Sequence, residues 1–186
     1  MYFSGYILEK DARGQFLGYA WAIFRMRADG SGTRKLTHPE PTDHGTCHDS
    51  PAPSPDGRVI AFSIIDDCDH GFDPGITAID PDGRTVNPNR FNNRSGFDPT
   101  WSPYGRRLAF ASDSGIEVAS SDGSDRPRHV YRRGPASGPA WSPDGKWLAF
   151  STDGQVWVVR PDASSLRRAF RTGVWRSDPA WLPTAP

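Results

Sequence analysis

The chain has 186 residues, which is long enough for a substantial core, and its 22 lysines and arginines balance its 22 aspartates and glutamates. A formal net charge of zero provides no general attraction to nucleic acid or to an acidic membrane surface. No apolar run approaches the length of about 18 residues that a membrane span needs. We therefore expect no nucleic-acid partner and no membrane insertion.

The first residues, Met1 to Tyr6, lack the basic stretch and apolar core of a secretory signal. As it stands, the chain is expected to be cytoplasmic, and it would be periplasmic or secreted if a signal had been trimmed from it. Two cysteines neither prove nor exclude an oxidising compartment.

A short phrase recurs along the chain and organises it. It begins at Pro51, Pro99 and Pro139, and in truncated form at Pro179, so the starts lie 48, 40 and 40 residues apart. Each of the first three copies predicts a strand, a tight turn and a second strand, because proline presets φ, aspartate bonds local backbone and glycine accepts a positive φ. A third strand, a second turn and a fourth strand follow. This period and strand content are typical of a β-propeller blade.

The two ends complement each other. Residues 2–4 match the second strand of a unit, and residues 23–30 match a third strand and its turn, so the chain opens inside a blade. Residues 178–183 match the first strand of a unit, with no second strand after them. We expect one all-β domain over residues 1–186, a propeller of four four-stranded blades whose first blade is closed by the C-terminal strand. The expected blades are 1–37 with 178–183, 49–91, 97–132 and 137–171. Alternatively, two chains exchange end strands as a homodimer with one eight-bladed ring.

These phrases resemble the repeat of the TolB-type propellers, which are relatives of the WD repeat. Met26–Ser31 with Leu36–Thr37 and the stretch Pro139–Phe150 carry the resemblance, which covers nearly the whole chain. The resemblance implies a propeller but no single function, since such propellers include the periplasmic TolB partner protein, peptidase-associated propellers and oligogalacturonate lyases. The chain departs from the family in having fewer blades, and Pro53 stands where other copies have tryptophan.

Three segments are longer than their counterparts in the other repeats: 5–20, 38–50 and 65–75. In an up-and-down blade all three fall on one face, at the border of the first two blades. Loops on a rigid scaffold commonly carry binding functions, so we expect this face to engage a ligand or partner. Its candidate residues are His44, His48, Asp49, Asp66, Asp67, Asp69, His70 and Asp73.

Both cysteines lie in these segments, and the hairpin centred near residues 55–57 places Cys47 roughly opposite Cys68. Three interpretations remain open. The first is a disulfide, and the second is a zinc site formed by Cys47, His48, Cys68 and His70, with His44 as a substitute ligand. The third is a polar loop without a ligand. Calcium bound by Asp66, Asp67, Asp69 and Asp73 is a variant of the second.

Catalytic motifs are absent: the sequence has no nucleophile elbow, phosphate loop or dinucleotide fingerprint. We therefore assign no catalytic residue and expect a non-catalytic module that binds a protein or small molecule, without a cofactor unless zinc or calcium is present. One alternative is a metal-dependent lyase or hydrolase at the His/Cys/Asp cluster. Another is a lectin-like sugar binder using the non-repeating Trp147, Trp157 and Trp175, whereas Trp101, Trp141 and Trp181 recur with the repeat and indicate scaffold.

Overall fold

The computed structural model describes residues 1–10, 12–40, 42, 44–69, 74–86, 95–169 and 179–182. Every regular element in these ranges is a β-strand, and they contain no helix that could cross a membrane. The chain divides into two compact units, Met1–Pro53 with Gly57–Phe97, and Ser54–Asp56 with Asp98–Pro186. The expected all-β class is confirmed.

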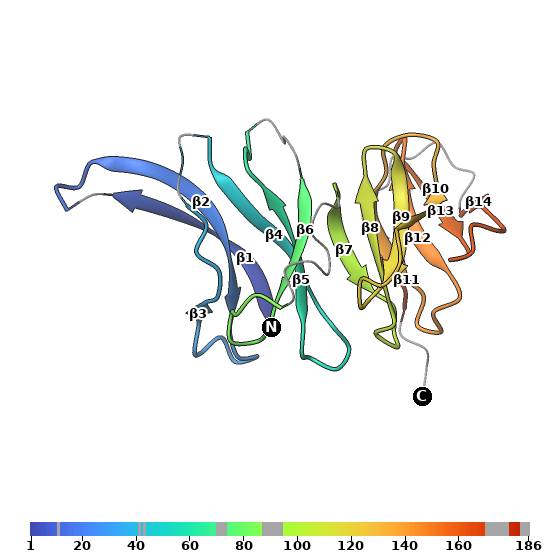
Figure 1. The fold of residues 1–186 in the computed structure, drawn as a ribbon, viewed down its shortest axis with the longest axis horizontal. Coiled ribbons are helices and arrows are strands. Elements are labelled where there is room, and N and C mark those ends of the chain that lie inside the picture. Colours follow the sequence, from blue (N-terminus) through green and yellow to red (C-terminus); the bar gives the residue numbers. More distant parts are fainter. Residues whose placement is uncertain are drawn as a thin grey trace. The chain divides into compact units, whose positions relative to one another are not determined.

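The first unit contains one six-stranded sheet with the order β1-β2-β4-β5-β6, in which β3 also pairs with β2 (Figure 1). Ile23, Ile60 and Phe62 are buried together at the centre of its core. The strands are β1 (Tyr2–Lys10), β2 (Phe16–Arg25), β3 (Arg34–Lys35), β4 (Thr46–Pro53), β5 (Ile60–Ile65) and β6 (Gly75–Ile79).

The expected long loop over residues 5–20 is wrong for most of its length. β1 and β2 instead form a long antiparallel hairpin that pairs Tyr2 with Arg25 at one end and Lys10 with Phe16 at the other (Figure 1). The inserted residues include Tyr6, Ile7, Phe16 and Tyr19, whose aromatic and β-branched side chains favour a pleated strand over a loop. The insertion therefore lengthens two strands and adds a rigid surface.

β2 and β4 pair in parallel at two positions, Ala20 with Thr46 and Trp21 with Cys47. By the repeat, these strands are expected in different blades, whereas this short ladder joins them in one sheet. Both strands are longer than the five residues typical of the second unit's strands, and the parallel ladder lies within the lengthened part of β2. The insertions thus link the two neighbouring repeats.

The second unit contains two four-stranded antiparallel sheets. One has the order β10-β9-β8-β7 and the other the order β11-β12-β13-β14. The strands are β7 (Phe97–Trp101), β8 (Arg107–Ser112), β9 (Gly115–Ser120), β10 (Arg128–Tyr131), β11 (Ser137–Trp141), β12 (Leu148–Thr152), β13 (Gln155–Val159) and β14 (Arg167–Arg168).

The repeated turn has the predicted geometry. Gly57, Gly105 and Gly145 adopt φ values of 70°, 69° and 68°, a left-handed conformation that favours glycine. In the best-matching copy, Ser142 Oγ donates to Asp144 Oδ1 and accepts from the backbone N–H of Trp147. The recurring phrase therefore builds scaffold.

The recurring tryptophans also build scaffold. The Trp141 indole donates to the carbonyl oxygen of Thr100 at 3.2 Å, and the Trp181 indole donates to that of Ala140 at 3.0 Å. Each bond spans one repeat, so the truncated C-terminal copy keeps the contact of a complete one. Residues 179–182 belong to no strand. The number of blades, their boundaries and closure of the first blade by residues 178–183 stay predictions.

Candidate functional site

The strongest surface feature lies on the β1–β2 hairpin. The register pairs Tyr6 with Trp21 and Leu8 with Tyr19, and directly paired residues of an antiparallel ladder project to the same side. These four side chains, hereafter the aromatic face, therefore occupy one side of the hairpin. The other side carries Ala20 and Ala22, which are buried. One side of the hairpin thus packs into the unit while the other is presented to solvent.

The aromatic face is exposed and internally ordered. Tyr6, Leu8 and Trp21 are 50%, 57% and 37% exposed. The Tyr6 ring lies 5.7 Å from that of Tyr19 and 5.6 Å from that of Trp21, in tilted and edge-on arrangements that aromatic pairs favour. Phe16 and Leu17 are exposed beside it, so five of the nine exposed large hydrophobic side chains in the described residues lie within residues 6–21. Such concentration is typical of an interaction site.

Tyr19 connects this face to the loop after β5. Its hydroxyl donates to Asp69 Oδ1 at 2.5 Å. This hydrogen bond, with desolvation and the negative charge of Asp69, raises the pKa of Tyr19 to about 12. Gly45 lies against the same ring, because a Cβ built there would overlap Tyr19 Cε2. The aromatic face and residues 66–69, hereafter the acidic loop, therefore form one surface within the first unit.

A disulfide anchors this loop. Cys47 in β4 is bonded to Cys68, with the Cα atoms 5.7 Å apart. The backbone N–H of Cys68 also lies within hydrogen-bonding distance of the carbonyl oxygens of His44 and Gly45. In the strand ladder Cys47 pairs with Ile65, so Cys68 reaches Cys47 by folding back beyond the end of β5. The disulfide interpretation is confirmed, and while it is intact neither sulfur is a free thiolate for zinc.

His48 and Asp49 are strand residues of β4 rather than loop residues. The His48 ring packs 5.2 Å from that of Phe62, and burial lowers the pKa of His48 to about 4. Asp49 accepts a hydrogen bond from Ser4 Oγ at 2.5 Å and another from the Ser50 backbone N–H at 2.7 Å. Asp49 thereby ties β4 to β1, and both side chains support the sheet that carries the aromatic face.

The remaining candidates lie around the acidic loop. His44 Nδ1 is 3.9 Å from Asp69 Oδ2, and Asp67 accepts from the Asp69 backbone N–H. Asp66 is exposed. His70 and Asp73 lie outside the described residues. In the part of the chain that the structure describes, no three His, Cys, Asp or Glu side chains converge as a metal site.

The tryptophans of the sugar-binding alternative do not form a shared platform in the described residues. Two guanidinium groups, from Arg160 and Arg167, lie over the Trp147 ring at 5.2 and 5.0 Å from its centroid. Trp157 is half-buried in β13, and Trp175 lies outside the described residues. Trp147 is therefore occupied by the protein's own cations.

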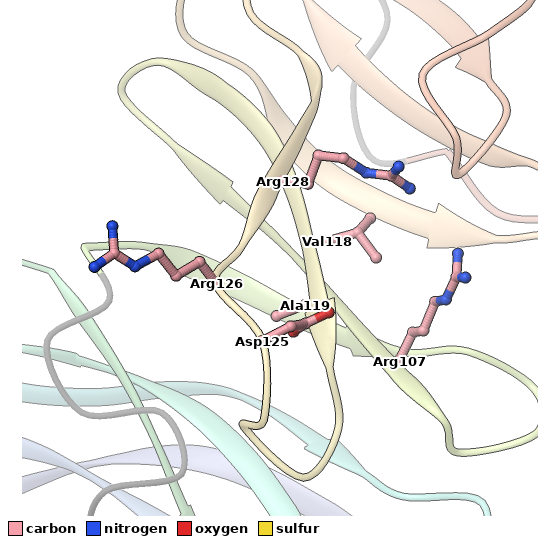
Figure 2. Close-up of a pocket in the computed structure, with 6 residues that line it drawn as sticks. All are labelled: Arg107, Val118, Ala119, Asp125, Arg126 and Arg128. Atoms are coloured by element: carbon pink, nitrogen blue, oxygen red, sulfur yellow. The ribbon is translucent and has the colours of Figure 1, made fainter.

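The second unit has a pocket of about 320 Å³ (Figure 2). Arg107 and Arg128 point to one side of it, whereas Arg126 points away. The Arg128 guanidinium already donates to the carbonyl oxygen of Pro161 at 2.8 Å, and Asp125 accepts from the Ser120 backbone N–H. A carboxylate on the lining offsets the arginine charge, so this pocket is a weaker candidate than the aromatic face. Its lining residues are Arg107, Val118, Ala119, Asp125, Arg126 and Arg128.

The site residues predicted from the sequence did not include Tyr6, Leu8, Tyr19 or Trp21. A partial signal was present in the spacing, because Tyr6 and Leu8 stand two residues apart, as do Tyr19 and Trp21. Residues two apart in a strand project to the same side. This spacing places each pair on one side of its strand, but it does not give the register that brings both pairs to the same side.

No family model and no curated protein matches the chain. Solved structures do match it. A putative TolB from Agrobacterium tumefaciens has a TM-score of 0.62 and 21% identity, over 90% of this chain and 61% of that one. TolB from Acinetobacter baumannii has a TM-score of 0.63 and 19% identity, over 91% and 41%. A chain of a nidogen/laminin complex has a TM-score of 0.66 and 15% identity, over 88% and 61%.

This chain therefore spans about two fifths to three fifths of the length of these structures. TM-scores above 0.6 demonstrate a shared fold. Because the identities are at most 21%, the similarity extends to the fold alone. The fold of this chain is that of the TolB-like β-propellers, as the recurring phrase predicted.

Proposed function

We propose that this chain is a non-catalytic interaction module and that it binds a partner protein through the aromatic face and the adjoining acidic loop, residues 66–69. The observation that carries the proposal is the clustering of Tyr6, Leu8 and Trp21 on the exposed side of a rigid hairpin. Tyrosine and tryptophan dominate the energetic centres of protein interfaces because they bury a large area with few rotatable bonds.

Several features support binding rather than catalysis. The side chains around the aromatic face are held by a disulfide and by the bond between Tyr19 and Asp69, so the surface is formed before a partner arrives. Preformed surfaces lose less conformational entropy on association. The His48 ring is packed against Phe62 in the sheet, so it is not presented to solvent as a general base would be. TolB and a chain of a nidogen/laminin complex share the fold, and the latter, a complex of two proteins, provides an analogy for a protein partner.

We also propose an oxidising compartment, the periplasm or the extracellular space, as the site of function. The Cys47–Cys68 bond supports this location, because disulfides are rare in the reducing cytosol.

Photo-crosslinking in the source cells tests the proposed surface. The photoreactive residue p-benzoylphenylalanine replaces Tyr6, Trp21 or, as the control, Tyr104, which is also aromatic and is 73% exposed in the second unit. We expect a discrete protein adduct from positions 6 and 21 and none from position 104. The purified partner should then bind the unmodified chain and bind the Tyr6→Ala variant at least tenfold more weakly. Equal adducts at all three positions, or none at positions 6 and 21, would contradict the proposal.

A further inference from the structure

The composition of the surface indicates the chemistry of its partner. The aromatic face presents three rings in contact, with the Tyr6 ring in the middle. The faces of tyrosine and tryptophan rings attract cations through their quadrupole. Leu8, paired beside Tyr19, adds an aliphatic contact at the same place. A partner segment that combines a cation with apolar side chains would use both parts of this face.

The adjoining loop supplies the opposite charge. Asp69 Oδ1 accepts the Tyr19 hydroxyl, while its side chain remains 52% exposed and keeps lone pairs toward solvent. Asp66 and Asp67 stand in the same loop. The hydrogen bond to Asp69 is the largest cause of the raised pKa of Tyr19, and the negative charges of Asp69 and Asp67 add to it. Another neighbour of this carboxylate is the His44 imidazole, whose Nδ1 lies 3.9 Å from Asp69 Oδ2.

The hairpin's own cations stand away from its central ring. Lys10 lies four residues beyond Tyr6 on β1 and two beyond Leu8, which corresponds to roughly 13 Å and roughly 7 Å along a strand. Arg13 belongs to the hairpin tip, and Arg25, at the end of β2, donates to the carbonyl oxygen of Pro81. Asp69, by contrast, touches the ring system directly through Tyr19. A carboxylate is therefore in hydrogen-bond contact with the rings of this face.

We infer that this surface binds an arginine side chain from an exposed, partly apolar segment of the partner protein, with the guanidinium on the rings of the aromatic face and paired with Asp69. Arginine suits both contacts at once, because its planar guanidinium stacks on aromatic rings and donates two parallel hydrogen bonds to a carboxylate. Lysine is a compact, strongly hydrated charge that forms only one of these contacts well. The inference rests on the proposed function and specifies the partner's chemistry.

Fluorescence polarisation with four matched peptides tests the inference. Each fluorescein-labelled octapeptide alternates leucine with a second residue, which is arginine, lysine, citrulline or glutamate. Citrulline keeps the shape of arginine without its charge. We expect the arginine peptide to bind at least tenfold more tightly than the citrulline and glutamate peptides, and several-fold more tightly than the lysine peptide. Its affinity should fall as sodium chloride rises from 50 to 500 mM.

Variants assign the binding to this surface. Asp69→Asn removes the charge, and Tyr6→Leu keeps an apolar strand former while removing the ring. Each substitution should therefore weaken binding of the arginine peptide about tenfold. Asp144→Asn, which alters an exposed carboxylate in a turn of the second unit, and Tyr104→Ala should leave binding unchanged. Thermal unfolding of each variant by circular dichroism verifies that it is folded.

The outcomes separate this inference from the proposed function. If all four peptides bind equally and Tyr6→Leu weakens all of them, the surface binds partners but arginine selectivity is overturned. If no peptide depends on Tyr6 or Asp69 and the crosslinking is also negative, both proposals fail. If sedimentation velocity without peptide shows a dimer that Tyr6→Leu dissociates, the occupant is a second copy of this chain and the inference is overturned.

Discussion

At the scale of single residues, chemically similar side chains take different roles according to burial. His44 is exposed beside Asp69, whereas His48 is enclosed in β4 against Phe62. Removal from water disfavours the imidazolium, which is the main reason that the pKa of His48 falls to about 4. The nearby charge of Asp66 opposes this effect only in part. His48 is thus a neutral part of the core across the physiological pH range.

This burial predicts a pH-dependent stability. The folded pKa of His48 lies below its unfolded value of 6.5, so the unfolded state binds the proton more readily. The contribution of neutral His48 to the free energy of unfolding is fully present above pH 6.5. It is lost as the pH falls toward 4, by at most about 3 kcal/mol. Urea unfolding at pH 7.5 and pH 4.5 should reveal the loss, and His48→Leu should reduce it. An NMR titration midpoint near 6.5 for His48 would contradict the assignment.

At the scale of elements, the β1–β2 hairpin and the acidic loop depend on each other through Tyr19. Gly45 provides the space for that ring, and it adopts a φ of 72°. Gly14, in the hairpin turn, adopts a similar φ of 80°, but a Cβ built there would meet no other atom of the described residues within 4 Å. The two glycines therefore share a backbone requirement and differ only in what surrounds them.

Alanine at each glycine separates these effects. Gly14→Ala should cost about 1 kcal/mol of unfolding free energy, from the left-handed backbone alone. Gly45→Ala should cost more, because the new methyl group displaces the Tyr19 ring and strains its hydrogen bond to Asp69. Gly45→Ala should also weaken binding of the arginine peptide, whereas Gly14→Ala should leave that binding unchanged. Equal losses of unfolding free energy and unchanged peptide binding would show that Gly45 is not needed for this contact.

The disulfide is the second element-scale constraint. It closes a loop with a sequence separation of 21 residues, for which chain-entropy estimates predict about 3 kcal/mol of stabilisation. Thiol titration of the denatured protein should find no free thiol before reduction and two after it. The Cys47→Ser/Cys68→Ser double variant should lose stability and bind the arginine peptide more weakly. Two free thiols with one equivalent of zinc by elemental analysis would instead favour the metal alternative.

At the scale of the whole molecule, the open question is how the ring closes. In the fourth expected blade Ala140 pairs with Ala149. By the repeat, their counterparts are Ala180 and Tyr2. The single-chain ring therefore predicts that residues 178–183 pair with β1 of the same chain, whereas the eight-bladed alternative pairs them with β1 of a second chain.

An engineered cysteine pair distinguishes these closures. We expect the Tyr2→Cys/Ala180→Cys variant to form a bond within one chain on mild oxidation, because paired strand residues lie within the Cα spacing of a disulfide. Non-reducing electrophoresis with mass spectrometry would identify it. A covalent dimer through the same positions would favour the two-chain ring, and failure to form either bond, with the single-cysteine variants as controls, would refute closure by this strand.

The recurring phrase made the fold predictable because its signals are local. Proline, aspartate and glycine determine each turn within a few residues, and the apolar runs after them become the buried strands around Phe110 and Phe150. The candidate site was predicted only in part. The Cys47–Cys68 bond confirms one of the three interpretations left open, whereas the insertion 5–20 was expected as a loop although it is mostly strand.

By itself, the amino-acid sequence determined the strands, the turns and the repeat, since each depends on residues close together in the chain. Only the tertiary structure decided that Tyr6, Leu8, Tyr19 and Trp21 share one exposed side, because a shift of one residue in register would turn one strand's side chains to the other side. The tertiary structure also decided the hydrogen bond between Tyr19 and Asp69, which are 50 residues apart in the chain. Contacts between such distant residues arise from packing, which no local pattern encodes.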